Sequence, residues 1–364
     1  MIDMRKIWIK IHLFLGLLLG SIFLIIALTG SLLVFDHKID ELLNPQLITS
    51  EGRGVHKSID EILDSAKHFQ KNTTSPIQLR FPRTEKGVYT IYFRPDTGGS
   101  LETYIDPYSA EPLGKRLWGT YLMSFIYRLH YTFLMGKLGK QMVGIIGVFL
   151  IFSTLSGICI WWPKKYKNIL KMIRIRRSRG KFLLYYDLHR TIGFFTFIFI
   201  IALAISGFSM IFPKYVKSLL SIGQSPKFFS KITTKKEIIS MDRACEIAKT
   251  VFEKGVIKRI SLPRKENDTV RVMLRQPQQV TRSYVWIDQY SGQVLGSQAP
   301  EDRSIGELAF GWMFPIHSGA AFGLLGRYTV FMTGLATVAL CIFGVGSWWE
   351  KRRFRQISKT SFRK

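Results

Sequence analysis

The sequence predicts a mainly α integral membrane protein: four transmembrane helices in two tandem repeats, each repeat enclosing a small extracytoplasmic α+β module. Three observations predict this fold. The 364-residue chain contains four long apolar runs, a set of motifs that occurs twice at fixed offsets, and two long segments of more balanced charge that separate the runs.

The chain repeats itself along its apolar parts. Residues 128–162 match residues 315–349 at a constant offset of 187 without a gap, and a second pair of segments, beginning at His12 and His189, matches at an offset of 177. Matches at a fixed offset indicate duplicated structural units. Because each copy begins and ends on the same side of the membrane, we expect parallel repeats about an axis along the membrane normal.

Each apolar run has the length of a membrane span. A helix needs about 20 residues to cross a hydrocarbon core of about 30 Å, and the four runs cover about 11–35, 141–162, 190–212 and 328–349. The first run is far longer than the apolar part of a signal peptide and is interpreted as a retained helix.

The basic residues predict how the spans are oriented. The chain holds 52 Lys and Arg against 25 Asp and Glu, and nine basic residues with no acidic one fall in 164–181. Seven basic residues and one acidic residue follow in 350–364. Since positive residues in short loops stay cytoplasmic, both termini are expected in the cytoplasm and the two long segments outside. The charge excess is therefore a topology signal, and we expect no nucleic-acid partner.

The predicted segments follow from these spans. They are a first transmembrane helix at 1–36, an external module at 37–127, a second helix with its outer lead-in at 128–163, a basic cytoplasmic loop at 164–186, a third helix at 187–213, a second external module at 214–311, a fourth helix with its lead-in at 312–349 and a basic cytoplasmic tail at 350–364.

Each external segment predicts one helix and short strands. Helical spacing at 59–69 and 243–252 precedes stretches of alternating polarity. Residues 104–109 match residues 286–291 at an offset of 182, and both contain an Ile-Asp pair followed by Tyr-Ser. The expected strands are 77–81, 88–93 and 102–106 in the first module and 257–262, 270–275 and 283–288 in the second.

Several motifs resemble a known family. Spans one and three open with a histidine followed four residues later by a glycine, the first holds Thr29-Gly30-Ser31 and the third Ser206-Gly207, and span two closes with Ser-Gly and a Trp pair. These features resemble the PepSY-associated transmembrane proteins, and the external modules resemble PepSY domains. The resemblance covers essentially the whole chain. It implies a bacterial inner-membrane protein similar to haem-containing ferric-siderophore reductases of iron uptake.

Four histidines are the candidate cofactor ligands. His12 and His189 begin spans one and three, while His130 and His317 precede the outer ends of spans two and four. Histidines on neighbouring helices at matching height suit six-coordinate haem, and ionisable residues in spans are candidate functional groups. With the resemblance, this predicts two bis-histidine b haems, an inner one on His12 and His189 and an outer one on His130 and His317. The alternative is that these histidines are interfacial residues.

The outer pair raises a geometric difficulty. A continuous helix from His130 to Trp162 would be about 48 Å long, which would carry the outer histidines far above the bilayer. Either the helix breaks at Gly136 and Gly139 and folds back, or the outer site differs. His37 is the reserve ligand, although its counterpart in the third span is a lysine.

Glycines and arginines complete the candidate site. Gly16 and Gly193 lie one turn from His12 and His189 on the same face, and Gly30 and Gly207 lie five turns from the same histidines, again on that face. At these positions a missing side chain could admit a flat macrocycle. Close helix packing is the alternative role for glycine in membrane helices. The candidate partners of haem propionates are Arg190 and Arg327.

The expected function is transmembrane electron transfer to an extracytoplasmic ferric substrate. The chain has no GxGxxG or P-loop motif, so the donor would be quinol or a cytoplasmic flavoprotein. The ferric substrate follows from the resemblance, as a ferric siderophore or another ferric chelate. The alternatives are a cytochrome b-like redox subunit with a non-iron acceptor and a haem-free, membrane-anchored PepSY module that binds or regulates a partner. A metal permease is disfavoured because the spans lack the buried carboxylates expected of an ion path. Asp187 is the only acidic residue near a span start, and it is expected at the interface.

Overall fold

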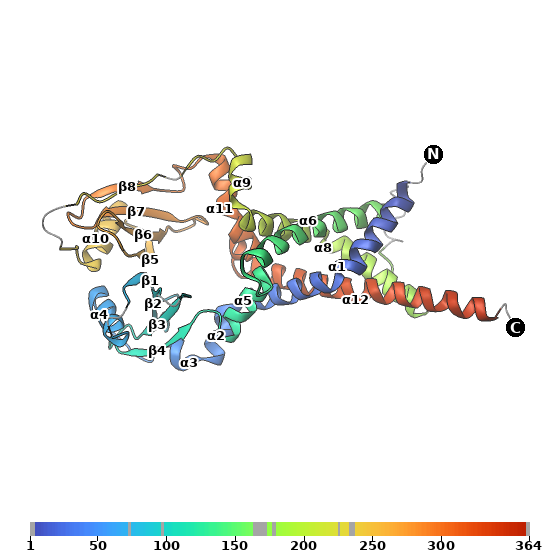
Figure 1. Cartoon of the computed structure of the whole chain (residues 1–364), viewed down its shortest axis with the longest axis horizontal. Coiled ribbons are helices and arrows are strands. Elements are labelled where there is room, and N and C mark those ends of the chain that lie inside the picture. Colours follow the sequence, from blue (N-terminus) through green and yellow to red (C-terminus); the bar gives the residue numbers. More distant parts are fainter. Residues whose placement is uncertain are drawn as a thin grey trace. The chain divides into compact units, whose positions relative to one another are not determined.

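The computed structural model describes residues 4–71, 74–95, 98–162, 173–176, 180–224, 226–232 and 237–361. The chain forms two compact units (Figure 1). The helical unit comprises Met1–Phe35, Ile126–Val216 and Met313–Lys364, and the sheet unit comprises Asp36–Phe125 and Lys217–Trp312. Most of the predicted basic loop and the last three residues of the predicted tail lie outside the described residues.

Four long helices dominate the helical unit: α1 (Met4–Leu33), α6 (Gly136–Trp161), α8 (Lys181–Ile211) and α12 (Gly323–Ser361). Within the described residues, four helical stretches are long and apolar enough to cross a membrane, which confirms the predicted spans. Helices α1 and α8 each pack against both α6 and α12. The four helices therefore form a bundle in which α6 and α12 each lie between α1 and α8.

Two short helices, α5 (Leu122–Thr132) and α11 (Ile305–His317), precede the second and fourth spans. Between α5 and α6 the chain takes positive φ at Phe133, Leu134 and Gly136. A Cβ at Gly139 would overlap the carbonyl of Thr132, so only glycine lets the end of α5 approach α6 this closely. The segment from His130 to Trp162 is therefore not one continuous helix. It breaks near Gly136 and Gly139, which is the first of the two alternatives given above.

The second break has the same physical cause. Gly319 and Gly323 have positive φ on either side of a 3-10 turn, η2 (Ala320–Phe322), between α11 and α12. A Cβ at Gly326 would overlap the carbonyl of Gly319. His130 and His317 are therefore placed on separate short helices and not on extended ends of the spans.

The sheet unit contains one antiparallel sheet of eight strands, in the order β4-β3-β2-β1-β5-β6-β7-β8. The strands are β1 (Pro76–Arg80), β2 (Tyr89–Phe93), β3 (Leu101–Ile105), β4 (Pro112–Leu117), β5 (Val256–Ser261), β6 (Thr269–Arg275), β7 (Ser283–Asp288) and β8 (Val294–Gln298). Six of these were predicted. The two edge strands β4 and β8 were not, because each contains a glycine and neither contains a buried residue, which removes the alternating pattern.

The strands of the two predicted modules pair into this single sheet. Strand β1 pairs with β5, with Leu79 opposite Ile260. The two modules, which were expected to hold a separate sheet each, therefore share one continuous sheet. Local sequence patterns carry no information about pairing between strands so far apart in the chain. We refer to the β1–β5 junction as the seam.

Helices α4 (Ile59–Phe69) and α10 (Met241–Val251) pack on one face of the sheet. Their apolar faces and the inward side chains of the strands form one core, with Ile62, Ala66, Ala244 and Ala248 fully buried. The smaller helices of this unit are α2 (Asp36–Leu43) and α3 (Pro45–Ile48), and α9 (Pro213–Leu219) joins it to the third span.

Helices α4 and α10 cap each other at their first turns. The Asp242 carboxylate accepts hydrogen bonds from the backbone N–H groups of Ile59 and Asp60 at 2.9 and 3.1 Å. Asp60 in turn accepts from Met241 and Asp242 at 3.0 and 3.3 Å. Burial raises the pKa of Asp60, and the adjacent Asp242 carboxylate raises it further against the lowering effect of the backbone N–H groups.

These caps predict a measurable contribution to stability. Replacing Asp242 with Ala leaves two N–H groups of α4 without their acceptor, which costs about 1–2 kcal/mol. We expect the melting temperature of the detergent-solubilised chain to fall by several degrees. The control is Asp64→Ala, which removes an exposed carboxylate that pairs with Lys67. An equal fall in both variants would contradict the capping role.

The same carboxylates predict a pH dependence. Since the pKa of Asp60 is raised in the folded state above its ordinary value of 3.8, the folded chain retains a proton that the unfolded chain has lost. This contribution to stability is present at low pH and is lost as the pH rises through the raised pKa. We expect Asp60→Asn to remove this component from melting curves measured across mildly acidic pH, and an unchanged slope would contradict it.

Candidate functional site

The helical unit brings the four predicted histidines together in two pairs. His12 on α1 and His189 on α8 have ring centres 5.9 Å apart. His130 on α5 and His317 on α11 have ring centres 6.1 Å apart. Each pair joins residues that are far apart in the sequence.

Each histidine is held by a backbone carbonyl of a neighbouring helix. For the inner pair, Nδ1 of His12 lies 2.9 Å from the Ser153 carbonyl and Nδ1 of His189 lies 2.8 Å from the Leu340 carbonyl. A carbonyl oxygen can only accept, so Nδ1 carries the hydrogen in each case. The hydroxyl of Ser156, 3.0 Å from Nδ1 of His12, adds a second contact.

The outer pair is held in the same way. Nδ1 of His130 lies 3.0 Å from the Ile26 carbonyl on α1, and Nδ1 of His317 lies 3.0 Å from the Leu203 carbonyl on α8. Hydroxyl groups of Thr29 and Ser206 lie 3.2 and 3.1 Å from the same nitrogens. In all four histidines Nδ1–H is engaged, which leaves Nε2 as the nitrogen with a free lone pair.

A glycine lies against each imidazole. A Cβ built on Gly157 would lie 3.1 Å from Cε1 of His12, and one on Gly344 would lie 3.2 Å from Cε1 of His189. At Gly30 the distance to His130 would be 2.8 Å, and at Gly207 the distance to His317 would be 3.1 Å. These close approaches allow the rings to pack directly on a neighbouring helix.

The four predicted glycines therefore fall into two groups. Gly30 and Gly207 contact the outer histidine rings themselves. Gly16 has no atom within 4 Å of an added Cβ, and Gly193 has only Leu340 within that range, at 3.6 Å. Gly16 and Gly193, one turn from the inner histidines, are therefore not in close contact with another helix.

The two candidate arginines differ in their surroundings. Arg190 lies 3.2 Å from the fully buried carboxylate of Asp187, which also accepts from Arg176 at 2.8 Å. Within the described residues, Nε of Arg190 is buried and has no hydrogen-bond partner. Arg327 is exposed and has no ion-pair partner within the described part of the chain.

The reserve ligand is not placed with either pair. His37 belongs to the sheet unit, where it lies on α2 with Nε2 at 3.6 Å from the carboxylate of Asp36. Its side chain is half exposed. The four paired histidines all belong to the helical unit.

The spacing of both pairs would allow the two imidazoles of each pair to hold one haem iron between them. Metal–imidazole bonds are about 2 Å long, and the ring centre lies about 1 Å beyond the nitrogen, so two imidazoles on opposite sides of one iron have centres about 6 Å apart. A histidine ligand that donates its other N–H to a carbonyl has its tautomer and orientation fixed. Within the described residues, no group of three or more His, Cys, Asp or Glu side chains is placed to hold a metal ion.

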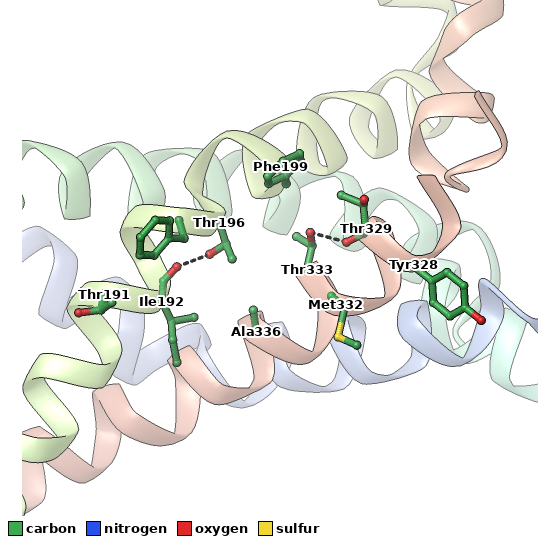
Figure 2. A pocket seen from close by; sticks show the side chains of 10 residues that line it. Thr191, Ile192, Thr196, Phe199, Tyr328, Thr329, Met332, Thr333 and Ala336 are labelled. Atoms are coloured by element: carbon green, nitrogen blue, oxygen red, sulfur yellow. Dashed lines mark hydrogen bonds between the residues drawn. The ribbon is translucent and has the colours of Figure 1, made fainter. Parts of the chain in front are cut away.

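A groove of about 610 Å³ lies between α8 and α12 (Figure 2). The hydroxyls of Thr196 and Thr333 donate to the carbonyls of Ile192 and Thr329, one turn earlier on their own helices. No charged side chain lines it. The lining residues are Thr191, Ile192, Phe195, Thr196, Phe199, Tyr328, Thr329, Met332, Thr333 and Ala336.

The groups that orient the histidines were missed by sequence reasoning. Backbone carbonyls have no sequence signature, but Gly157 and Gly344 had one. They match at the offset of 187 that relates His130 to His317. The repeat marks them as candidates only, because Gly147 and Gly334 repeat at the same offset and contact no histidine.

Comparison with known proteins identifies the family. The family model described as the PepSY-associated TM region matches residues 9–351. No curated protein matches the sequence significantly.

Among solved structures, a protein described as a "putative lipoprotein" from Clostridium difficile 630 is similar over 69% of this chain and 97% of its own. The identity is 10% and the TM-score is 0.29. A likeness at this level carries no argument about fold or function.

The glycine contacts predict that two alanine substitutions on α6 differ in their effect on stability. Gly157→Ala places a methyl group 3.1 Å from His12, whereas Gly147→Ala places one no closer than 3.8 Å to any neighbour. We expect Gly157→Ala to lower the melting temperature of the purified chain and Gly147→Ala to leave it unchanged or raise it, because alanine favours helix by about 1 kcal/mol. Equal melting temperatures for the two variants would contradict the tight contact at His12.

Proposed function

Because this chain belongs to the PepSY-associated transmembrane family, we propose that it is a di-haem membrane protein that carries electrons across the bilayer to a ferric substrate. One observation carries the proposal: four histidines from four helices form two pairs with ring centres 5.9 and 6.1 Å apart. In every one of them a neighbouring carbonyl holds Nδ1–H. His12 and His189 would ligate the inner haem, and His130 and His317 the outer one.

The inferred tandem repeat supports the proposal. The carbonyl partners Ser153 and Leu340 are 187 residues apart, the offset that relates His130 to His317. The partners Ile26 and Leu203 are 177 residues apart, the offset that relates His12 to His189. A repeat that includes the orienting groups as well as the ligands favours a common role over four unrelated interfacial histidines.

The chain's own residues prepare the ligands. The carbonyl bonds fix each imidazole in the tautomer that has a free Nε2, and the glycines let the rings pack against a helix. The bundle surrounds the inner pair with apolar helices, which limits access of water. When bound, haem supplies one-electron redox chemistry, with axial ligands and burial setting its potential.

The two pairs lie at different positions along the helices. On α1, His12 and the Gly30 that contacts His130 are 18 residues apart, which is about 27 Å of helix. This separation is close to the thickness of the hydrocarbon core. It supports a path that begins near one face of the membrane and ends near the other.

The proposed orientation puts both termini of the chain in the cytoplasm of a bacterium and the sheet unit outside its inner membrane. The support is the concentration of Lys and Arg in 164–181 and 350–364. Electrons would enter from quinol or a flavoprotein on the inner side. The acceptor would be a ferric siderophore or another ferric chelate, since reduction to the ferrous ion weakens binding by hard oxygen ligands.

The haem content of the purified chain tests the proposal. We expect a six-coordinate b-type spectrum with two haems per chain, which shifts on reduction with dithionite. His12→Ala and His189→Ala should each leave one haem, because only the inner pair is lost, and His317→Ala should leave the other. His68→Ala, at an exposed histidine of α4, is the control and should retain both.

Other outcomes would separate the alternatives. A chain that stays colourless when it is expressed with ample haem would contradict the redox function and favour an anchored binding module. Two haems without reduction of any ferric chelate would favour a redox subunit with a different acceptor.

A further inference from the structure

The face of the sheet opposite α4 and α10 carries two continuous rows of mostly polar side chains. The strand register defines both rows. The first runs Gly114, Tyr104, Thr90, Arg80, Arg259, Met273, Tyr284 and Gln298. The second runs Arg116, Glu102, Tyr92, Gln78, Ser261, Arg271, Trp286 and Gly296.

Three arginines of these rows gather at the seam. Arg80 on β1 and Arg259 on β5 are direct cross-strand partners. Arg271 lies on β6 in the adjoining row, opposite Ser261. Like charges that face each other across a strand pair destabilise a sheet, so this arrangement needs compensation.

No carboxylate provides that compensation. Within the described residues, none of Arg80, Arg259 and Arg271 forms an ion pair, and Nε of Arg259 is buried with no hydrogen-bond partner. Burial lowers the pKa of Arg259. The neighbouring Tyr284 raises it, and the guanidinium groups of Arg282, Arg271 and Arg80 lower it further. Within the described residues, no carboxylate therefore lies within ion-pair distance of the seam arginines.

Another arginine of the same face, Arg116, does have a carboxylate partner. Arg116 donates two hydrogen bonds to the carboxylate of Asp40, at 2.9 and 2.8 Å. The nearby carboxylate of Glu102 is also occupied, because it accepts from the hydroxyls of Tyr104 and Tyr121 at 2.7 and 2.9 Å. These acidic groups are committed to the β3–β4 side of the face and are not available to the seam.

Aromatic rings flank the seam arginines. The guanidinium of Arg80 lies 4.6 Å from the ring centre of Tyr92, and that of Arg271 lies 5.7 Å from the ring centre of Tyr284. Trp286 is the cross-strand neighbour of Arg271. Planar cations between aromatic rings recognise ligands that combine negative oxygens with flat aromatic groups.

We propose that the seam, through Arg80, Arg259 and Arg271, binds an anionic ferric chelate whose ligand groups are aromatic oxygen donors of the catecholate type. This inference rests on the proposed function for the identity of the metal. The guanidinium groups supply donors in a fixed plane for the chelate's oxygens, and Tyr92, Tyr284 and Trp286 supply the surfaces for its rings. The proposal requires no residue of the histidine pairs.

The experiment measures binding without redox chemistry. Gallium(III) tricatecholate, a redox-inert anion, is titrated calorimetrically into the full chain in nanodiscs of zwitterionic phosphatidylcholine. We expect Arg80→Gln, Arg259→Gln and Arg271→Gln each to weaken binding on the order of tenfold, because each removes charge-assisted hydrogen bonds. The matched control is Lys249→Gln, which removes one exposed positive charge from α10, on the other face of the sheet.

Arginine-to-lysine variants test the planar fork. Arg259→Lys keeps the charge and should still weaken binding, since an ammonium group cannot reproduce bidentate donation. Retained folding of every variant is checked by its melting temperature. A gallium desferrioxamine B complex, which is cationic, should bind weakly and should not respond to the three arginine substitutions.

The outcomes separate this inference from the proposed function. Binding of the gallium anion that is unchanged in all three Gln variants, or reduced equally by Lys249→Gln, would overturn the seam site. Loss of that binding when phosphatidylglycerol replaces phosphatidylcholine would also overturn it, in favour of a lipid headgroup as the occupant. A chain without haem that still binds the anion through these arginines would refute the proposed function and leave the seam site standing.

Discussion

The hydrogen bond from each histidine Nδ1–H to a carbonyl of a neighbouring helix is the interaction on which the helical unit depends. It requires the ring to lie directly against that helix, and this in turn requires glycine at the contact. For His12 the carbonyl belongs to Ser153 and the glycine is Gly157, one turn later on α6. The position of each ring is thereby fixed by the packing of two helices, and the pairs can form only when the whole bundle has assembled.

The same constraint explains the breaks before the second and fourth spans. If α5 continued into α6 without interruption, His130 would be carried away from α1 and could not reach the carbonyl of Ile26. The positive φ values around Gly136 and the close approach at Gly139 turn the chain instead. The turn combines positive φ at Phe133, Leu134 and Gly136 with a close approach that requires glycine at position 139.

Local sequence patterns predicted the spans and six strands, because apolar length and alternation are properties of neighbouring residues. The repeat along the chain drew attention to the four histidines. They did not predict that β1 and β5 pair, since this depends on residues such as Leu79 and Ile260 meeting across most of the chain. They also left open whether Gly30 faces a cofactor or a side chain; in the structure it lies against His130. The arginines of the seam were invisible for the same reason, because their proximity follows from strand register and not from sequence spacing.

The central claim is that electrons cross the membrane through the two histidine pairs. The most direct measurement uses liposomes that contain the purified chain and enclose ferricyanide, with dithionite added outside. The account predicts that the enclosed ferricyanide is reduced much faster than in empty liposomes, and that His12→Ala or His317→Ala returns the rate to that of empty liposomes. A rate equal to that of empty liposomes for the haem-loaded wild-type chain, or an undiminished rate in both variants, would contradict it.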